Sequence, residues 1–160
     1  MDLSPKAIAF CRRTHTYPNT YFLEGNSQDL PLADAAVNIV TNLESSHCYP
    51  DIAAFYREVY RVLKPGGYFL YTDVLPVVRL DECMGFLRET GFHMERELDI
   101  TRNVLLSCDD ISSHHAKIFL KENHQGVMNN FLAVPNSPVY NHMRTGQYKY
   151  MLFKFRKPIA

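Results

Sequence analysis

The stretch YREVYRVLKPGGYFLYTD, from Tyr56 to Asp73, decides the fold. Its first half belongs to a run in which apolar side chains recur at helical spacing, with charged side chains on the other side. Pro65-Gly66-Gly67 ends this run, and the apolar residues that follow predict a strand from Tyr68 to Val74. We therefore expect a helix that begins near Pro50-Asp51, stops at a tight turn and leads into a buried strand. Its predicted apolar face comprises Ile52, Phe55, Tyr56, Val59, Val62 and Leu63.

Strands and helices alternate on both sides of this unit. Ser4-Pro5 is a cap followed by a helix-starting proline. Val37 to Leu43 is apolar on both faces, as in a buried parallel strand. This alternation predicts a parallel α/β sheet. The other predicted elements are a helix over Lys6–Arg13, a short strand over Tyr21–Leu23, a helix over Leu80–Thr90 and a strand over Phe92–Ile100.

The C-terminal third of the sequence has a different pattern of predicted elements. It predicts a long helix over Thr101–Glu122, a short helix that starts at Ser137-Pro138, and a last strand over Tyr148–Phe155. Internal repeats and low-complexity linkers are absent from the sequence, so a single domain over residues 1–160 is the simplest organisation. Residues 102–147 are predicted to form a helical cap within it.

Composition excludes several classes of protein. The 160 residues hold 17 Lys and Arg against 17 Asp and Glu, which argues against a nucleic-acid-binding protein. Apolar runs such as Val37–Val40 are too short to span a membrane, and the N-terminus does not resemble a signal peptide, so we expect a cytoplasmic protein. The four cysteines are scattered without metal-site spacing, and we expect no metal.

Five stretches, in this order along the chain, resemble the class I S-adenosylmethionine-dependent methyltransferases. The ESSHCYPD segment narrows the resemblance to methyltransferases of lipid and polyketide tailoring, similar to the phthiotriolone dimycocerosate type. The resemblance implies an incomplete Rossmann-like sheet and methyl transfer from S-adenosylmethionine to a small, lipid-like or polyketide-like acceptor. The five stretches are DLSPKAIAFCRR (2–13), YFLEGNSQDLPLAD (21–34), VNIVTNLESSHCYPD (37–51), YREVYRVLKPGGYFLYTD (56–73) and LRETGFHMERELDIT (87–101).

The resemblance also implies cofactor-binding residues. Asp2 matches the carboxylate that binds the two ribose hydroxyls, and Leu3 would pack on the adenine. Asn26 stands where the family usually has Asp, and an amide oxygen accepts a hydrogen bond more weakly than a carboxylate. Ser27 and Gln28 would add backbone contacts. Asn42 and Leu43 end the fourth family strand and would face the sulfonium side of the cofactor.

Two residues after that strand are candidates for catalysis. Histidine titrates near neutral pH, which makes His47 the best-placed general base. Glu44 would orient it or bind the acceptor. The alternative is that both residues only cap the loop before Asp51, and the sequence leaves this choice open.

One departure from the family pattern concerns the glycine-rich loop. The sequence has no G-x-G, and the family sheet order 3-2-1-4-5-7-6 would lack its first strand and most of its second. We therefore expect an N-terminally truncated sheet in which Val37–Leu43 is an exposed edge. That edge predicts homodimerisation or binding of a partner, so a non-catalytic module remains the alternative to an enzyme.

Overall fold

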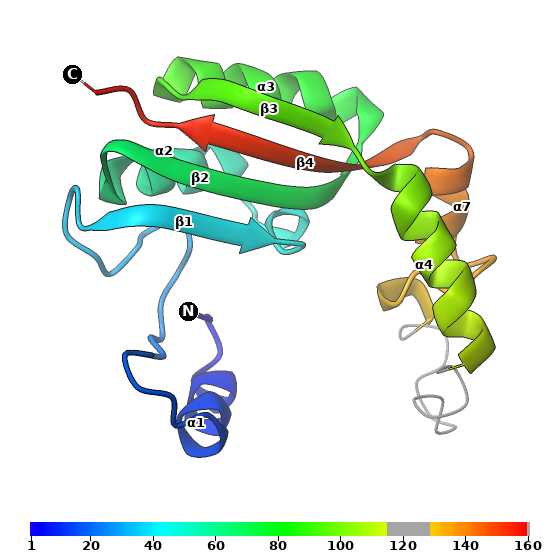
Figure 1. The fold of residues 1–160 in the computed structure, drawn as a ribbon, viewed down its shortest axis with the longest axis horizontal. Helices are drawn as coiled ribbons and strands as arrows, with labels where there is room; N and C mark the ends of the chain where they lie inside the picture. The colour runs from blue at the N-terminus through cyan, green and yellow to red at the C-terminus, as the bar shows by residue number, and fades with distance from the viewer. Residues whose placement is uncertain (115–128, 160) are drawn as a thin grey trace.

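The computed structural model describes residues 1–114 and 129–159, with side chains described to Asp110 and again from Asn129. Helices α2 and α3 cover one face of a four-stranded sheet, α4 and α7 lie together at one end of it, and α1 stands apart near the N-terminus (Figure 1). The helices are α1 (Pro5–Thr14), α2 (Ile52–Val62), α3 (Val77–Thr90), α4 (Thr101–His114), α7 (Pro138–Arg144) and the short 3-10 turn η1 (Ser46–Cys48). The strands are β1 (Val37–Leu43), β2 (Leu63–Pro76), β3 (His93–Asp99) and β4 (Tyr148–Arg156).

The strand order is β1-β2-β4-β3. This is the 4-5-7-6 half of the order that the resemblance implies. β1 and β2 are parallel, whereas β4 is antiparallel to both of its neighbours. The expectation of a parallel sheet is therefore wrong beyond the first pair. β4 lies between β2 and β3, and its reversed direction follows from the short connection of the chain from α7 into β4.

Helix α2 forms as its sequence predicts. The Asp51 side chain accepts a hydrogen bond from the backbone N–H of Ala54 at 2.8 Å, which caps the helix. Its predicted apolar face is buried from Ile52 to Val62 and packs against the sheet. The helix ends at Val62 and Leu63 already belongs to β2, so the strand starts earlier than predicted.

The PGG turn allows a close approach of two backbones. A Cβ atom on Gly67 would lie 2.9 Å from the carbonyl oxygens of Asn38 and Lys64. Gly66 has φ +79°, a conformation that glycine adopts without strain. The two glycines thus let the chain reverse tightly beside the start of β1.

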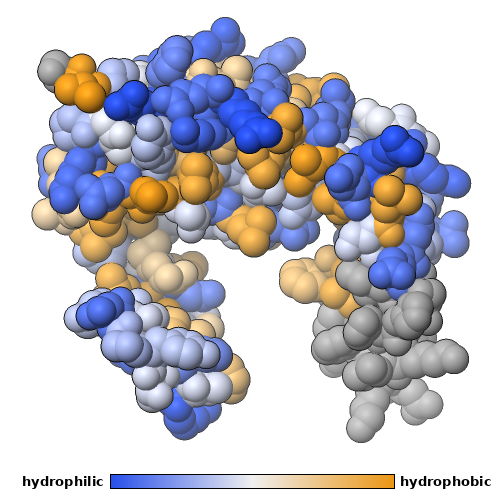
Figure 2. Space-filling model, in the orientation of Figure 1, coloured by the Kyte–Doolittle hydropathy of each residue, from blue (hydrophilic) through white to orange (hydrophobic). Residues whose placement is uncertain are grey.

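The two faces of the sheet differ in burial. The core lies between the sheet and the pair α2 and α3, and its buried ring side chains come mainly from α2, β2 and β4. On the other face Ile39 is 54% exposed and Leu43 is 71% exposed. Figure 2 shows apolar patches on this face among polar residues. The exposed apolar strand residues are Ile39, Leu43, Leu70, Met94 and Leu98.

Two further expectations need correction. Tyr21–Leu23 is not a strand, because the backbone beside it forms only an isolated bridge between Asp2 and Glu24. β1 is not buried on both faces, since Asn42 is its only buried side chain. The edge position of β1 is as predicted. The end predicted for the long helix at Glu122 lies outside the described residues.

Candidate active site

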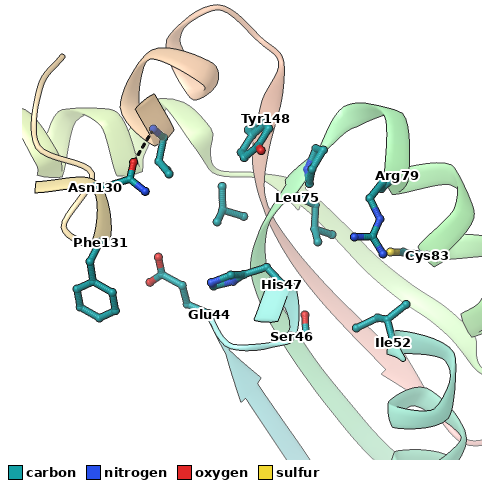
Figure 3. A pocket seen from close by; sticks show the side chains of 13 residues that line it. Glu44, Ser46, His47, Ile52, Leu75, Arg79, Cys83, Asn130, Phe131 and Tyr148 are labelled. Atoms are coloured by element: carbon teal, nitrogen blue, oxygen red, sulfur yellow. Dashed lines mark hydrogen bonds between the residues drawn. The ribbon is translucent and has the colours of Figure 1, made fainter. Parts of the chain in front are cut away.

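A cavity of about 570 Å³ opens where β1 and β2 end. The loop after β1 and the turn η1 form one wall, α3 forms another, and residues next to α7 form the third (Figure 3). The carboxyl ends of strands are where α/β folds bind their ligands. The lining residues are Glu44, Ser46, His47, Ile52, Val74, Leu75, Pro76, Arg79, Cys83, Asn130, Phe131, Val139 and Tyr148.

His47 reaches this cavity from η1. Glu44 has φ +49°, an uncommon left-handed conformation for a side-chain-bearing residue, and it turns the chain from β1 toward η1. The His47 side chain is 37% exposed and extends into the cavity next to Glu44 (Figure 3). Its Nδ1 lies 2.7 Å from Asp73 Oδ1. One ring nitrogen is thus bound to a carboxylate, which leaves Nε2 for a ligand.

Asp73 is the functional residue that the sequence analysis missed. It lies on β2 and is fully buried, and both of its oxygens are hydrogen-bonded. Oδ1 accepts from the N–H of Val74 at 2.8 Å, besides its contact with the His47 ring. Oδ2 accepts from Ser46 Oγ at 2.5 Å and from the N–H of His47 at 3.2 Å. The sequence feature that could have identified Asp73 is its position near the end of a predicted strand that neighbours the His47 loop.

Among the described residues, no hydrogen bond joins Glu44 to the His47 ring. The Glu44 carboxylate accepts a hydrogen bond from the phenol of Tyr150 at 3.0 Å instead. Burial, with the Glu44 charge next to it, raises the pKa of the Tyr150 phenol. Tyr150 therefore keeps its proton at neutral pH and acts as the donor to Glu44.

A second cavity of about 530 Å³ adjoins the first. Both are lined by Glu44, Val74, Phe131 and Val139, so they meet at these residues. Most side chains of the second cavity are apolar, and they come from β1, β2, β4, α4, α7 and the segment before α7. The first cavity, where Glu44, Ser46, His47 and Arg79 lie among apolar side chains, thus opens toward a more apolar one.

The residues predicted to bind the adenosine side of the cofactor form one group. Asp2 pairs with the Leu23–Gly25 segment through Asp2 N to Leu23 O at 3.2 Å and Gly25 N to Asp2 O at 3.0 Å. Asn26 Oδ1 accepts from the N–H of Gln28 at 3.0 Å, which closes a turn around Ser27. Asp2 and Leu3 are exposed beside this turn. The structure therefore brings together Asp2 and the loop that holds Asn26.

The other two predicted cofactor residues lie apart from this group, at the end of β1. Leu43 is exposed, whereas Asn42 is buried and donates to Ser45 Oγ at 2.8 Å and to the Tyr49 phenol at 3.2 Å. The Asn42 Oδ1 atom is buried without a hydrogen-bond partner among the described residues. Gln28 is used structurally, since its Oε1 accepts from the N–H of Asp51 at 3.1 Å.

Neither a metal site nor a membrane-spanning helix occurs in the described residues. Within residues 1–114 and 129–159, no three His, Cys, Asp or Glu side chains are grouped so as to hold a metal ion. No helix in the described parts of the chain is long and apolar enough to cross a membrane.

Known proteins similar in sequence to this chain are methyltransferases. A family profile described as a methyltransferase domain matches residues 1–71. A probable phthiotriol/phenolphthiotriol dimycocerosates methyltransferase 2 from Mycobacterium ulcerans is 37% identical over 128 residues, which cover 76% of this chain and 50% of that protein. A fatty-acid O-methyltransferase from Mycolicibacterium smegmatis is 45% identical over 94 residues, covering 59% of this chain and 34% of that protein.

The fold has a counterpart among solved structures. The geranyl diphosphate C-methyltransferase from Streptomyces coelicolor A3(2), in complex with Mg²⁺, geranyl diphosphate and S-adenosyl-L-homocysteine, superposes with a TM-score of 0.72 at 17% identity. The match covers 97% of this chain and 60% of that one, and at this identity it establishes the fold alone.

The chain spans about half the length of the curated relatives it matches. Within that span, the family profile and the sequence relatives are methyltransferases, and the solved structure shares the fold of this chain. The chain therefore belongs to the class I S-adenosylmethionine-dependent methyltransferase family.

Proposed function

We propose that this protein transfers a methyl group from S-adenosylmethionine to a hydroxyl-bearing, lipid-like or polyketide-like small molecule. The observation that carries the proposal is the His47–Asp73 pair at 2.7 Å, in a cavity at the carboxyl ends of β1 and β2. A histidine held by a buried carboxylate is suited to general-base catalysis. The family assignment adds the class of reaction.

His47 is the proposed base. When bound, S-adenosylmethionine supplies an electrophilic methyl group on a positively charged sulfur. Asp73 accepts the Nδ1 proton, which leaves a lone pair on Nε2 to take the proton from the acceptor hydroxyl as its oxygen becomes methylated. His47 then holds that proton as an imidazolium beside the Asp73 carboxylate. Glu44, held by Tyr150, is proposed to bind a polar group of the acceptor.

The residues predicted to bind S-adenosylmethionine fit the cofactor in part. Asp2, Leu3 and the Asn26–Gln28 turn would hold its adenosine side, and Asp2 is exposed there. Asn42 and Leu43 would face its amino-acid side. The unpartnered Asn42 Oδ1 suits a group that donates a hydrogen bond. Gln28 contributes little beyond its backbone, because its side chain is bound to α2.

The adjoining cavities support an acceptor with an apolar arm. The arm would lie among the aliphatic and aromatic side chains of the second cavity, and the reacting oxygen would lie near His47 in the first. Phthiotriol-type lipids and fatty acids appear in the names of two relatives. Within the predicted cap over residues 102–147, helices α4 and α7 are accordingly proposed to cover the acceptor, and residues 115–128 of that range lie outside the described residues.

The test measures methyl transfer by the 160-residue chain with radiolabelled S-adenosylmethionine and a panel of long-chain alcohols, diols and fatty acids. His47→Gln should lower turnover by about 10² or more, because a general base contributes on that order. Calorimetric affinity for S-adenosylmethionine should stay unchanged in this variant. His93→Gln, on the exposed strand β3, is the matched control and should retain full turnover. Equal turnover in His47→Gln and the parent would overturn the proposal.

The non-catalytic alternative receives no support from the comparisons, since the family profile and the similar proteins are named for methyltransferases. Association of two copies along the β1 edge is compatible with catalysis and remains a separate proposal.

A further inference from the structure

Buried hydroxyl groups form a chain that ends on the carboxylate holding His47. Ser46 Oγ lies 2.5 Å from Asp73 Oδ2 and 2.7 Å from the phenolic oxygen of Tyr71. The Tyr71 oxygen in turn accepts from the phenol of Tyr56 at 3.2 Å. Tyr56, Tyr71 and Asp73 are fully buried, and Ser46 is nearly so. The chain connects α2, β2 and η1, and the proposed proton transfer makes no use of it.

The hydrogen bonds between these hydroxyl groups all point in one direction. A carboxylate only accepts, so the Ser46 proton points to Asp73. Ser46 must then accept from Tyr71, and Tyr71 from Tyr56. Burial raises the pKa of both phenols, which keeps them protonated at neutral pH and therefore able to donate. Every hydroxyl in the chain thus directs its proton toward Asp73.

We propose that Ser46 and Tyr71 are positioning residues, which hold the Asp73 carboxylate so that His47 carries its proton on Nδ1 and its lone pair on Nε2. The role of these residues in catalysis rests on the proposed function, whereas their hydrogen bonds to Asp73 and to each other do not. The Ser46 hydroxyl stabilises the negative charge on Asp73, and so limits how strongly Asp73 stabilises the imidazolium form of His47. Tyr71 strengthens Ser46 as a donor, because hydrogen bonds in a chain polarise one another.

Other charged and titratable groups face His47 from every side of the cavity. Only Asp73 is within hydrogen-bond distance of the His47 ring among the described residues. The other groups are unchanged in every variant of the experiment, so their effect on the titration of His47 is constant. They are Glu44 after β1, Arg79 and Cys83 on α3, and Tyr148 on β4.

The experiment follows the titration of His47 by NMR of the imidazole nitrogens in the 160-residue chain, with the resonance assigned through His47→Gln. Ser46→Ala should raise the pKa of His47 by roughly half a pH unit, because Asp73 loses a donor. Tyr71→Phe should raise it by less. In the Ser46→Ala background Tyr71→Phe should add nothing, since Tyr71 acts through Ser46. Tyr60→Phe is the control, because it removes a phenolic oxygen from the same helix as Tyr56. It should leave the pKa of His47 unchanged.

Two results would overturn the inference. One is a His47 titration in Ser46→Ala that matches the parent, and the other is a Tyr71→Phe shift of equal size with and without Ser46. Where Tyr71→Phe does not fold, Tyr56→Phe replaces it, with a smaller upward shift expected. These outcomes leave the proposed function standing, whereas full methyl transfer by His47→Gln removes the function and leaves the NMR result intact.

Discussion

Arg61 fixes the loop that precedes β1 onto helix α2. Its guanidinium donates to the carbonyl oxygens of Leu30 and Leu32 and to Asp34, and it pairs with Glu58 at 2.7 Å. Glu58 in turn accepts from the N–H of Leu30 at 2.7 Å. Because this loop continues from the Asn26–Gln28 turn, the Glu58–Arg61 pair holds the proposed cofactor loop in place.

The pair predicts a loss of stability in acid. The hydrogen bond from Arg61 lowers the pKa of Glu58 below its ordinary value. A carboxyl group with a lowered folded-state pKa stabilises the fold above its unfolded pKa, and this contribution is lost as the pH falls through the folded value. In urea unfolding, the parent should therefore exceed Glu58→Gln in stability at about pH 6, and the difference should shrink toward about pH 3.

Glu89→Gln, on the exposed side of α3, provides the control for that comparison and should differ little from the parent at either pH. A Glu58→Gln difference that is constant from neutral to acid pH would contradict the role given to this ion pair.

At the scale of elements, two glycines should respond to alanine in opposite directions. Gly67 lies in β2, where a Cβ would meet two carbonyl oxygens at 2.9 Å, so Gly67→Ala should destabilise the chain by about 1–3 kcal/mol. Gly85 lies inside α3 with nothing within 4 Å of its would-be Cβ. Gly85→Ala should stabilise the chain by roughly 0.5–1 kcal/mol through helix propensity. Urea unfolding of both variants checks the pair, and equal effects would contradict the packing described for the PGG turn.

At the scale of the whole molecule, the β1 edge predicts self-association. β1 pairs only with β2 in the described structure, and Ile39 and Leu43 are largely exposed on it. Exposed apolar edge strands pair with other chains, and a charge on the edge opposes this. Light scattering should show association of the parent that Ile39→Lys reduces. Leu106→Lys, an exposed position on α4, should leave it unchanged. A monomeric parent at high concentration would contradict the prediction.

Local pattern was enough for most of the elements. The apolar spacing of α2 and its Asp51 cap are properties of adjacent residues, and the structure has both. The helix ends at Val62, before the predicted stop at Pro65-Gly66-Gly67. The Tyr21–Leu23 strand was wrong because a strand needs a neighbour, and that depends on residues distant in the chain. The parallel direction of the sheet failed at β4 for the same reason.

The candidate site divides in the same way. His47 and Glu44 could be selected from the sequence because they follow a strand in a loop of the family pattern, and their catalytic roles remain predictions. The partner of His47 could not be chosen correctly. Glu44 is three residues away and Asp73 is on another strand, yet the pairing of Asn42 with Tyr71 places the ends of β1 and β2 side by side.

The sequence by itself indicated the family and the residues offered to the site through short motifs, and most of the helices and strands through local periodicity. The strand order of the sheet followed only from the resemblance to that family. Only the tertiary structure decided that Asp73 rather than Glu44 holds His47, and that Ser46 and Tyr71 support Asp73. The physical reason is that a buried carboxylate takes its hydrogen bonds from whichever donors the folded strands bring within reach. Here Ser46 and His47 lie 27 and 26 residues from Asp73 along the chain, whereas the donor Val74 is adjacent to it.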